Sequence, residues 1–239
     1  MSKITIIAEM GINHQGKMSV AKELISQAKR CGADLVKSQL YDVDKLFPDK
    51  KIIAQNRNWY NEVKRTQLSK EQANELFQFG QKIGTEVFYS VFDLERLQWC
   101  EEMGTKMHKV ATRENKNKKL IEAMLNTKKN VLLSCQDRNT PYSPLYGALS
   151  YLYCVPEYPT PLDKINFNQI SFPHEFQGFS DHTLGTEASV CAMARGAKII
   201  EKHFTLSRGL VGPDQICSLE PNELRELVRY ARKFEEILC

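Results

Sequence analysis

The sequence predicts a single (β/α)₈ TIM barrel, and three observations lead to that fold class. Strand-like and helix-like patterns alternate from one end of the 239-residue chain to the other, and eight strand patterns can be counted. The length is close to the roughly 250 residues typical of a closed parallel barrel. Neither GxGxxG nor GxxxxGK[ST], phosphate loops typical of open doubly wound sheets, occurs in the chain. We therefore expect residues 1–239 to form one barrel domain.

The first half of the chain holds four short apolar runs that predict strands. They lie at residues 4–8, 35–39, 86–90 and 107–111. Helical patterns, with apolar residues three and four positions apart, follow from about 19, 69, 94 and 120. Ser69 and Gln72 have the spacing of a capping box, which predicts a helix start there. The connection 40–68 is too long for an ordinary barrel loop, so we expect it to cover an active site or form an interface.

The second half repeats the alternation. Strands are expected at 130–134, 149–154, 178–182 and 199–203. Residues 155–161 are rich in proline and should form a loop, with a short helix expected near 162–170. Helical spacing recurs at Ala188, Cys191, Ala192 and Arg195. Pro221 is expected to begin the last helix.

Composition narrows the class of protein. Hydrophobic residues make up 42% of the chain and charged residues 26%, an ordinary globular balance that argues against disorder. The net charge of +4 is mild, and no basic run with interleaved aromatics indicates nucleic-acid binding. No stretch approaches the length of a membrane span, and the N-terminus has no signal-peptide pattern. Seven dispersed cysteines without a CxxC pair indicate reduced thiols, so we expect a cytoplasmic protein.

Two of the expected strands end in a histidine. Residues two apart on a strand share a face, so Ser180 lies beside His182 and Glu201 beside His203. Consecutive parallel strands would place both imidazoles at the same rim of the barrel. A lone histidine near a strand end is usually a hydrogen-bonded structural residue, so the pair, rather than either residue alone, indicates metal binding or catalysis.

Functional groups of such barrels gather at the C-terminal ends of the strands. The polar residues at those ends are Glu9, Asn13, His14, Lys37, Gln39, Ser90, Asp93, Lys109, Thr112, Glu114, Ser134, Tyr158, Ser180, His182, Glu201 and His203.

Lys37 and Lys109 lie within apolar strand patterns. Because burying an isolated ammonium is costly, each must pair with a carboxylate such as Glu9 or bind an anion. The two lysines with the hydroxyls of Ser90, Thr112, Ser134 and Ser180 would suit a phosphate or a carboxylate. The two histidines with nearby carboxylates would suit a divalent ion such as Mn²⁺ or Zn²⁺. An anion site beside a Lewis acid indicates phosphate chemistry or carbonyl activation.

The motifs at these strand ends resemble those of a known family. EMGINHQG, VKSQ, KVAT, EYPTP, FSDHTLG and EKHFTL, followed by GPD and SLEP, occur in the order found in the catalytic barrel of the sialic acid synthase family. That family includes N-acetylneuraminate, legionaminate and pseudaminate synthases. The resemblance extends from Glu9 to about Glu220, and FSDHTLG together with EKHF is specific to the family.

The resemblance implies condensation of phosphoenolpyruvate with the open-chain aldehyde of an N-acyl amino sugar, such as N-acetylmannosamine, with release of phosphate. It assigns phosphoenolpyruvate to Lys37, Lys109, Ser134 and Ser180, and a metal ion, usually Mn²⁺, to His182 and His203. The sugar would face Gln39, Glu114, Tyr158 and Asp214. Glu9 and Glu201 would handle water and protons.

The chain also departs from the family pattern. Ser38 stands where an aromatic residue is usual, Val91 where a hydroxyl contacts phosphate, and Pro156 where a polar residue is common. Family synthases usually continue into an antifreeze-like domain that supplies an arginine to the sugar site of a partner subunit. We expect this domain to be missing after the last helix. Another chain could supply it, the protein could act on a different aldehyde substrate, or the sequence could be part of a longer protein. A homo-oligomer is one way to complete the site.

Two other functions fit the same residues. A Schiff-base aldolase could use Lys37 or Lys109 as its nucleophile. A non-catalytic barrel could keep the anion site and act as a binding or regulatory subunit beside a complete synthase.

Overall fold

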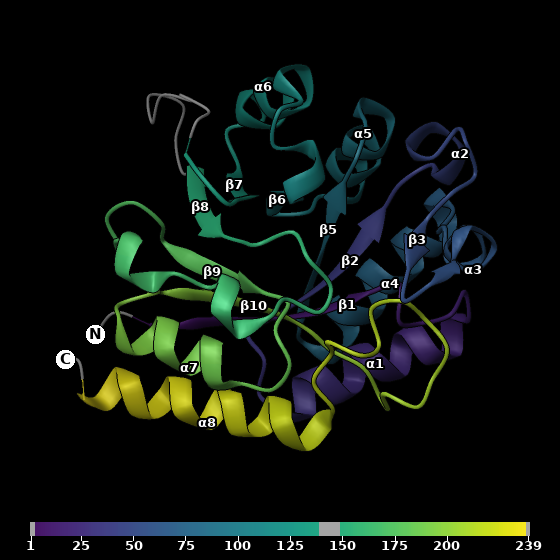
Figure 1. Ribbon diagram of the computed structural model, residues 1–239. Helices are drawn as coiled ribbons and strands as arrows, with labels where there is room; N and C mark the ends of the chain where they lie inside the picture. Colours follow the sequence, from purple (N-terminus) through teal and green to yellow (C-terminus); the bar gives the residue numbers. More distant parts are fainter. Residues whose placement is uncertain (1–2, 139–148, 238–239) are drawn as a thin grey trace.

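Eight parallel strands form a closed barrel in the computed structural model, which describes residues 3–138 and 149–237 (Figure 1). The strands follow one another around the barrel in the order β1 (Thr5–Gly11), β10 (Ile199–His203), β9 (Gly178–Asp181), β8 (Leu149–Tyr153), β7 (Asn130–Cys135), β6 (Met107–Val110), β5 (Glu86–Val91) and β2 (Leu35–Leu40). Pairing of β1 with both β10 and β2 closes the ring. The predicted fold class is confirmed.

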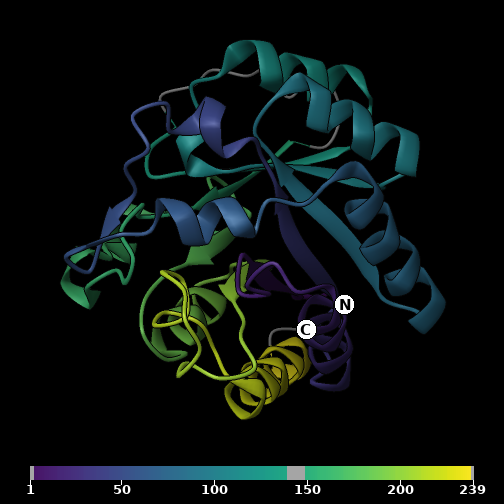
Figure 2. The ribbon, with the colours of Figure 1, turned by 90° about the vertical axis from the view of Figure 1, so that its right-hand side faces the viewer.

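Helices cover the outside of the barrel. They are α1 (Met18–Arg30), α4 (Lys70–Ile83), α5 (Leu94–Met103), α6 (Lys118–Asn126), α7 (Glu187–Ala194) and α8 (Pro221–Ile237). Ser69 caps α4 and forms the predicted capping box with Gln72. Figure 2 shows α8, in yellow, beside α1, in purple, so the last helix packs next to the first. No helix in the described part of the chain is long and apolar enough to cross a membrane.

The side chains inside the barrel change from apolar to polar along the strands. Its lower layer is apolar, and the buried side chains there are Ile7, Phe88, Leu132 and Leu152, with Leu35, Met107 and Ile199 packed against them. Two residues further along these strands, inward positions carry charge or hydroxyl groups, such as Glu9, Lys37 and Glu201. The apolar layer closes the barrel beneath the polar layer, which therefore faces the C-terminal mouth.

The connection between β8 and β9 differs from the expected short helix. It forms two 3₁₀ helices, η3 (Leu162–Lys164) and η4 (Phe167–Gln169). Aromatic rings fill the space beside the strands, and those in mutual contact are Tyr153, Phe167, Phe172, Phe176 and Phe179. This aromatic cluster covers the barrel where an α-helix would otherwise pack. The predicted alternation of strands and helices therefore fails between β8 and β9, where no α-helix occurs in the described residues. The connection from β7 to β8 includes residues 139–148, which lie outside the described residues, so the alternation is not tested there.

Helix α7 is confirmed, but its buried face differs from the stripe that spacing suggested. Ala188 and Ala192 are buried, whereas Cys191 and Arg195 are exposed. The helix instead buries Ser189, whose hydroxyl donates a hydrogen bond to Asp181 of β9. A polar contact with the barrel therefore sets the orientation of this helix.

The long 40–68 connection is a structured unit rather than a loop. It contains α2 (Val43–Leu46), the hairpin of β3 (Ile53–Ala54) and β4 (Arg57–Asn58), and α3 (Tyr60–Arg65). Its own apolar core comprises the buried residues Ile12, Tyr41, Val43, Trp59, Tyr60 and Val63. At the tip of the hairpin, the Gln55 amide donates to the carbonyl of Pro213 at 3.1 Å. The unit thus contacts the loop that follows β10, although its role as a cover or interface stays a prediction.

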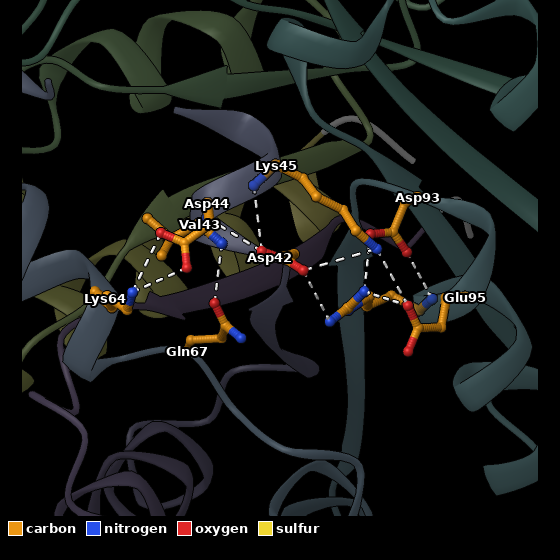
Figure 3. A network of polar contacts seen from close by, with 9 residues as sticks. Asp42, Val43, Asp44, Lys45, Lys64, Gln67, Asp93 and Glu95 are labelled. Atoms are coloured by element: carbon orange, nitrogen blue, oxygen red, sulfur yellow. Dashed lines mark hydrogen bonds and ion pairs between the residues drawn. The ribbon is translucent and has the colours of Figure 1, made fainter. Parts of the chain in front are cut away.

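A polar network anchors the start of this unit (Figure 3). Asp42 caps α2 by accepting from the backbone N–H groups of Asp44 and Lys45. Lys64 of α3 pairs with Asp44 at 2.9 Å, and the backbone N–H of Val43 donates to the Gln67 side chain. These contacts hold α2 and α3 together at the end of β2.

At the opposite end of the barrel, Asp34 joins β1 to α8. Its carboxylate accepts from the backbone N–H of Ile6 at 2.8 Å and from Arg232 at 2.7 Å, and it pairs with Lys3 at 2.7 Å. Burial alone would raise the pKa of Asp34, but these three donors together lower it from 3.8.

We expect Asp34→Asn to lower the free energy of unfolding by about 2 kcal/mol at neutral pH, because hydrogen bonds to a charged group are lost. Since the folded-state pKa is lowered, the contribution of Asp34 is complete above pH 3.8 and disappears as the pH falls through the lowered value. Urea unfolding of both proteins at pH 7 and pH 3 measures this. An equal difference at the two pH values would contradict the assignment.

Candidate active site

The charged residues at the barrel mouth come from neighbouring strands and meet inside the ring. Glu9 of β1, Lys37 of β2, Lys109 of β6 and Glu201 of β10 are all at least 95% buried. Alternate residues of each strand point into the barrel, and these four residues occupy inward positions. The apolar layer below them offers no polar partners, so their charges are compensated mainly by contact with one another.

Lys37 lies between the two carboxylates. Its ammonium is 2.9 Å from Glu9 Oε2 and 3.4 Å from Glu201 Oε1, and it donates to Ser90 Oγ at 2.7 Å. The sequence left open whether this lysine pairs with a carboxylate such as Glu9 or binds an anion. In the structure it is paired with Glu9 and Glu201, and binding of an anion by this lysine stays a prediction.

Lys109 is held less tightly by carboxylates. Its ammonium donates to Ser134 Oγ at 2.7 Å and to the Val110 carbonyl at 3.0 Å, and lies 3.8 Å from Glu201 Oε1. Ser180 donates to the same Glu201 oxygen at 2.9 Å. Glu201 is therefore the point where the two lysines and a strand-end serine converge.

Burial and charge move the pKa values of the two carboxyls in opposite directions. Burial raises the pKa of Glu9, with Lys37 opposing the rise. Burial acts on Glu201 too, but Lys109 and Lys37 outweigh it and lower its pKa. Two carboxyls whose environments separate their pKa values are suited to acid and base roles in one site. Burial also lowers the pKa of Lys109, so its proton is the more easily lost of the two ammonium groups.

The two histidines lie beside this cluster, as strand pairing required. Their ring centroids are 5.4 Å apart. His182 Nδ1 is 3.1 Å from the Val155 carbonyl. The buried Nδ1 of His203 lies 3.8 Å from Asp214 Oδ2 and has no hydrogen-bond partner among the described residues. Tyr158 stacks on His182 with ring centroids 3.9 Å apart and remains 42% exposed. Its exposed face borders the mouth of the site.

Gly11 permits a close meeting of three further predicted residues. A Cβ at this glycine would lie 3.1 Å from Glu9 Oε1, 3.2 Å from the Gln39 amide nitrogen and 3.4 Å from Asp214 Oδ2, and its φ of +45° also favours glycine. Gln39 donates to Glu9 Oε1 at 3.0 Å. Burial, followed by the nearby charge of Glu9, raises the pKa of Asp214 to about 6.

Thr112 and Glu114 are not drawn into the charged cluster. They lie on the turn η1 (Thr112–Glu114), where Thr112 donates to Cys154 Sγ at 3.1 Å and Glu114 accepts from Asn117 at 2.8 Å. Their expected contacts with substrate stay predictions.

The other polar strand ends have structural partners. Asn13 bonds the Phe204 carbonyl and Ser218, while Asp93 caps α5. Burial lowers the pKa of His14 to about 4, which favours its neutral form at physiological pH.

Sequence reasoning did not single out three residues that contact this region. Cys154 is buried at the end of β8, with its sulfur 3.8 Å from His182 Nδ1. Asp181 and Lys202, adjacent in the chain to the two histidines, form a fully buried ion pair at 3.1 Å. Cys154 follows a strand end and could have been found from the gathering of functional groups at the C-terminal ends of barrel strands. Asp181 and Lys202 point away from the barrel interior, so only the folded structure shows that they lie behind the histidines.

The fold and the geometry define a TIM-barrel protein with a buried charged site and two histidines at its mouth. Residues 24–239 match the NeuB family, and the chain belongs to that family. This confirms the resemblance seen in the motifs.

Known relatives span almost the whole chain. An N,N'-diacetyllegionaminic acid synthase of Campylobacter jejuni is 32% identical over 100% of this chain and 78% of its own. The human N-acetylneuraminate-9-phosphate synthase is 33% identical over 98% of this chain and 70% of its own. A solved N-acetylneuraminic acid synthetase from Leptospira borgpetersenii, in complex with citrate, superposes with a TM-score of 0.86 at 30% identity, over 99% of this chain and 85% of that one.

The balance of charge around Glu201 can be tested with inorganic phosphate. We expect Glu201→Gln to bind phosphate on the order of tenfold more tightly than the unaltered protein, because one buried negative charge no longer opposes the anion. Thermal unfolding with and without phosphate measures the difference. Glu101→Gln, which alters a carboxylate on α5 outside the barrel, is the control. Equal stabilisation of the Glu201→Gln protein and the unaltered protein by phosphate would contradict an anion site on the two lysines.

Proposed function

We propose that the protein condenses phosphoenolpyruvate with the open-chain aldehyde of an N-acyl amino sugar, giving a sialic-type nonulosonic acid and inorganic phosphate. One observation carries the proposal: in a NeuB-family barrel, two buried lysines with serine partners approach Glu201, which lies on the same strand as one member of a histidine pair. The names of the relatives, which are synthases of legionaminic and neuraminic acids, support the same product class.

Phosphoenolpyruvate would be held by Lys37 and Lys109 with Ser90, Ser134 and Ser180. Each lysine already donates to one of these serines, so the donors are oriented before substrate arrives. The substrate brings further negative charge next to two carboxylates. Glu9, whose pKa is raised by burial, is the carboxyl that takes up a compensating proton at least cost.

A divalent ion fits the histidine side of the site. The contact of His182 Nδ1 with the Val155 carbonyl favours the tautomer whose Nε2 is free as a ligand. His203 Nδ1 and Glu201 Oε2 are buried, and no residue in the part of the chain that the structure describes forms a hydrogen bond with either atom. No three His, Cys, Asp or Glu side chains within residues 3–138 and 149–237 are grouped as a metal site, so water or substrate would complete the coordination of two histidines. Such an ion, of which Mn²⁺ is our expectation, would supply Lewis acidity toward the aldehyde.

The sugar would occupy the side of the mouth bordered by Tyr158, Gln39 and Asp214, with Glu114 on the neighbouring turn. In the reaction, the C2–C3 double bond of phosphoenolpyruvate opens as C3 forms a bond to the aldehyde carbon, and protonated Glu9 gives its proton to the aldehyde oxygen. Water adds at C2 and gives one proton to Glu201. The C2–O bond to phosphate then breaks, and the C2 hydroxyl loses its remaining proton to the leaving phosphate as the keto group forms. The separated pKa values of the two carboxyls support such proton transfers.

One chain, or an assembly of chains, could provide all the residues that contact the sugar. A homo-oligomer or a partner chain would supply any further sugar contact that these residues lack. The gel-filtration mass of the active form, compared with the 27.5 kDa of one chain, would identify such an assembly.

We expect purified protein to release phosphate from phosphoenolpyruvate only when both an N-acyl hexosamine and Mn²⁺ are present. Lys109→Met should lower kcat/KM on the order of a hundredfold, equivalent to about 3 kcal/mol of transition-state stabilisation. A panel of N-acyl hexosamines, with chelator-treated protein as the control, measures this. Absence of release across the panel from protein shown to hold Mn²⁺ would refute the proposal.

One observation favours a second candidate: burial lowers the pKa of Lys109, as Schiff-base lysines require. Borohydride in the presence of pyruvate would trap that lysine in an aldolase and leave a condensing synthase unmodified. Tight phosphoenolpyruvate binding without turnover would instead indicate a binding subunit.

A further inference from the structure

We infer that the buried ion pair of Asp181 and Lys202 is a positioning device that fixes the two histidines relative to each other. The inference deepens the proposed function and rests on it, because it assigns the histidines a common ligand. Neither residue touches the interior of the site. They would act through the backbone on either side of His182 and His203.

The pair lies directly behind the histidines. Asp181 and Lys202 are register partners on β9 and β10, and each is followed in the chain by one of the two histidines. Their inward neighbours are Ser180 and Glu201, so the ion pair itself points toward the helical layer. There Ser189 of α7 donates to Asp181 Oδ2 at 2.6 Å, and both charged side chains are fully buried.

The same two side chains also hold the turn that follows His182. Asp181 Oδ1 accepts from the backbone N–H of Thr183 at 2.8 Å. Lys202 donates to the Thr183 carbonyl at 2.6 Å. Both peptide groups flanking Thr183 are therefore tied to a residue pair that spans the two strands. Any shift of β9 against β10 would break these bonds and separate the imidazoles.

Stability alone does not account for this arrangement. Replacement of a buried ion pair by well-packed apolar residues is often neutral or stabilising, because both charges must be desolvated. An apolar pair could fill the same volume, but it could neither accept from the Thr183 N–H nor donate to its carbonyl. The geometry points to orientation as the reason for these two charges.

The double variant Asp181→Leu/Lys202→Met separates the two roles. We expect it to remain folded, with a lowered midpoint of thermal unfolding, because the buried N–H and carbonyl of Thr183 lose their partners. Its dissociation constant for Mn²⁺, measured from the free-ion signal in electron paramagnetic resonance, should rise on the order of tenfold or more, as is usual when partners that orient metal ligands are lost. A folded double variant with an unchanged constant would overturn the inference.

A second readout uses the protein without metal. Imidazole ¹⁵N–¹H spectra of histidine-labelled protein, assigned with His182→Gln and His203→Gln, should show shifted or broadened His182 and His203 signals in the double variant, while His108 is unchanged. If the unaltered protein binds no Mn²⁺, the metal part of the proposed function fails, and these spectra still decide whether the pair positions the rings.

Three controls keep the result specific. Lys202→Arg retains the charge and the donor, and should keep the dissociation constant for Mn²⁺ within about threefold.

Ser189→Ala removes one hydrogen bond to Asp181 and should weaken Mn²⁺ binding by about threefold. If the double variant does not fold, the ring signals of this milder variant decide the question. Asp34→Asn, at the other end of the barrel, should lower the midpoint of unfolding without affecting either readout. Unmoved ring signals in every variant of the pair would show that it serves packing alone.

Discussion

The structure depends on a neutral cluster of buried charges resting on an apolar layer. Glu9, Lys37, Lys109 and Glu201 hold two negative and two positive charges inside the barrel, and serine hydroxyls form further hydrogen bonds with Lys37, Lys109 and Glu201. None of the four could be buried alone at reasonable cost. Their mutual compensation allows the barrel to keep ammonium groups in a place from which water is largely excluded, where an anion is bound more strongly than at the surface.

Different parts of the fold contribute to this cluster in different ways. The apolar layer around Phe88 fills the barrel below the charged cluster, so the cluster lies only at the C-terminal mouth. The 40–68 unit, with its own small core, extends from β2 and reaches the loop after β10 through Gln55. At the far end, Asp34 and Arg232 tie the first strand to the last helix. The contacts at the two ends thus hold the barrel closed and shape its mouth.

The sequence was sufficient for the fold and for most of the placement of the candidate site. Alternating strand and helix patterns predicted the barrel, and the two-residue period of a strand predicted that Glu201 and His203 would share a face. A pair of a buried lysine with Glu9 was one of the two outcomes that the sequence left open, and Lys37 forms it. The contact of Lys37 with Glu201 was not predicted, because the two residues lie far apart in the chain.

The remaining differences have similar physical origins. The 162–170 segment carries apolar residues that suggested a helix, but its aromatic side chain Phe167 packs into a cluster formed by β8, β9 and the adjoining loop. Cys191 is exposed because Ser189 turns α7 toward Asp181. Thr112 follows a strand but donates to Cys154 of a distant strand end, and Glu114 accepts from its neighbour Asn117. The first three of these outcomes depend on tertiary contacts that local spacing does not encode, whereas the Glu114 contact is local.

An anion site and a metal site that lie side by side at this mouth would both be visible by diffraction. Crystals soaked with MnCl₂ and phosphoenolpyruvate, with data recorded at the manganese absorption edge, provide the test. We expect an anomalous peak at coordination distance from nitrogens of both His182 and His203, and density for the anion in contact with Lys37 and Lys109. A peak bound elsewhere, or phosphoenolpyruvate density away from both lysines, would contradict this expectation.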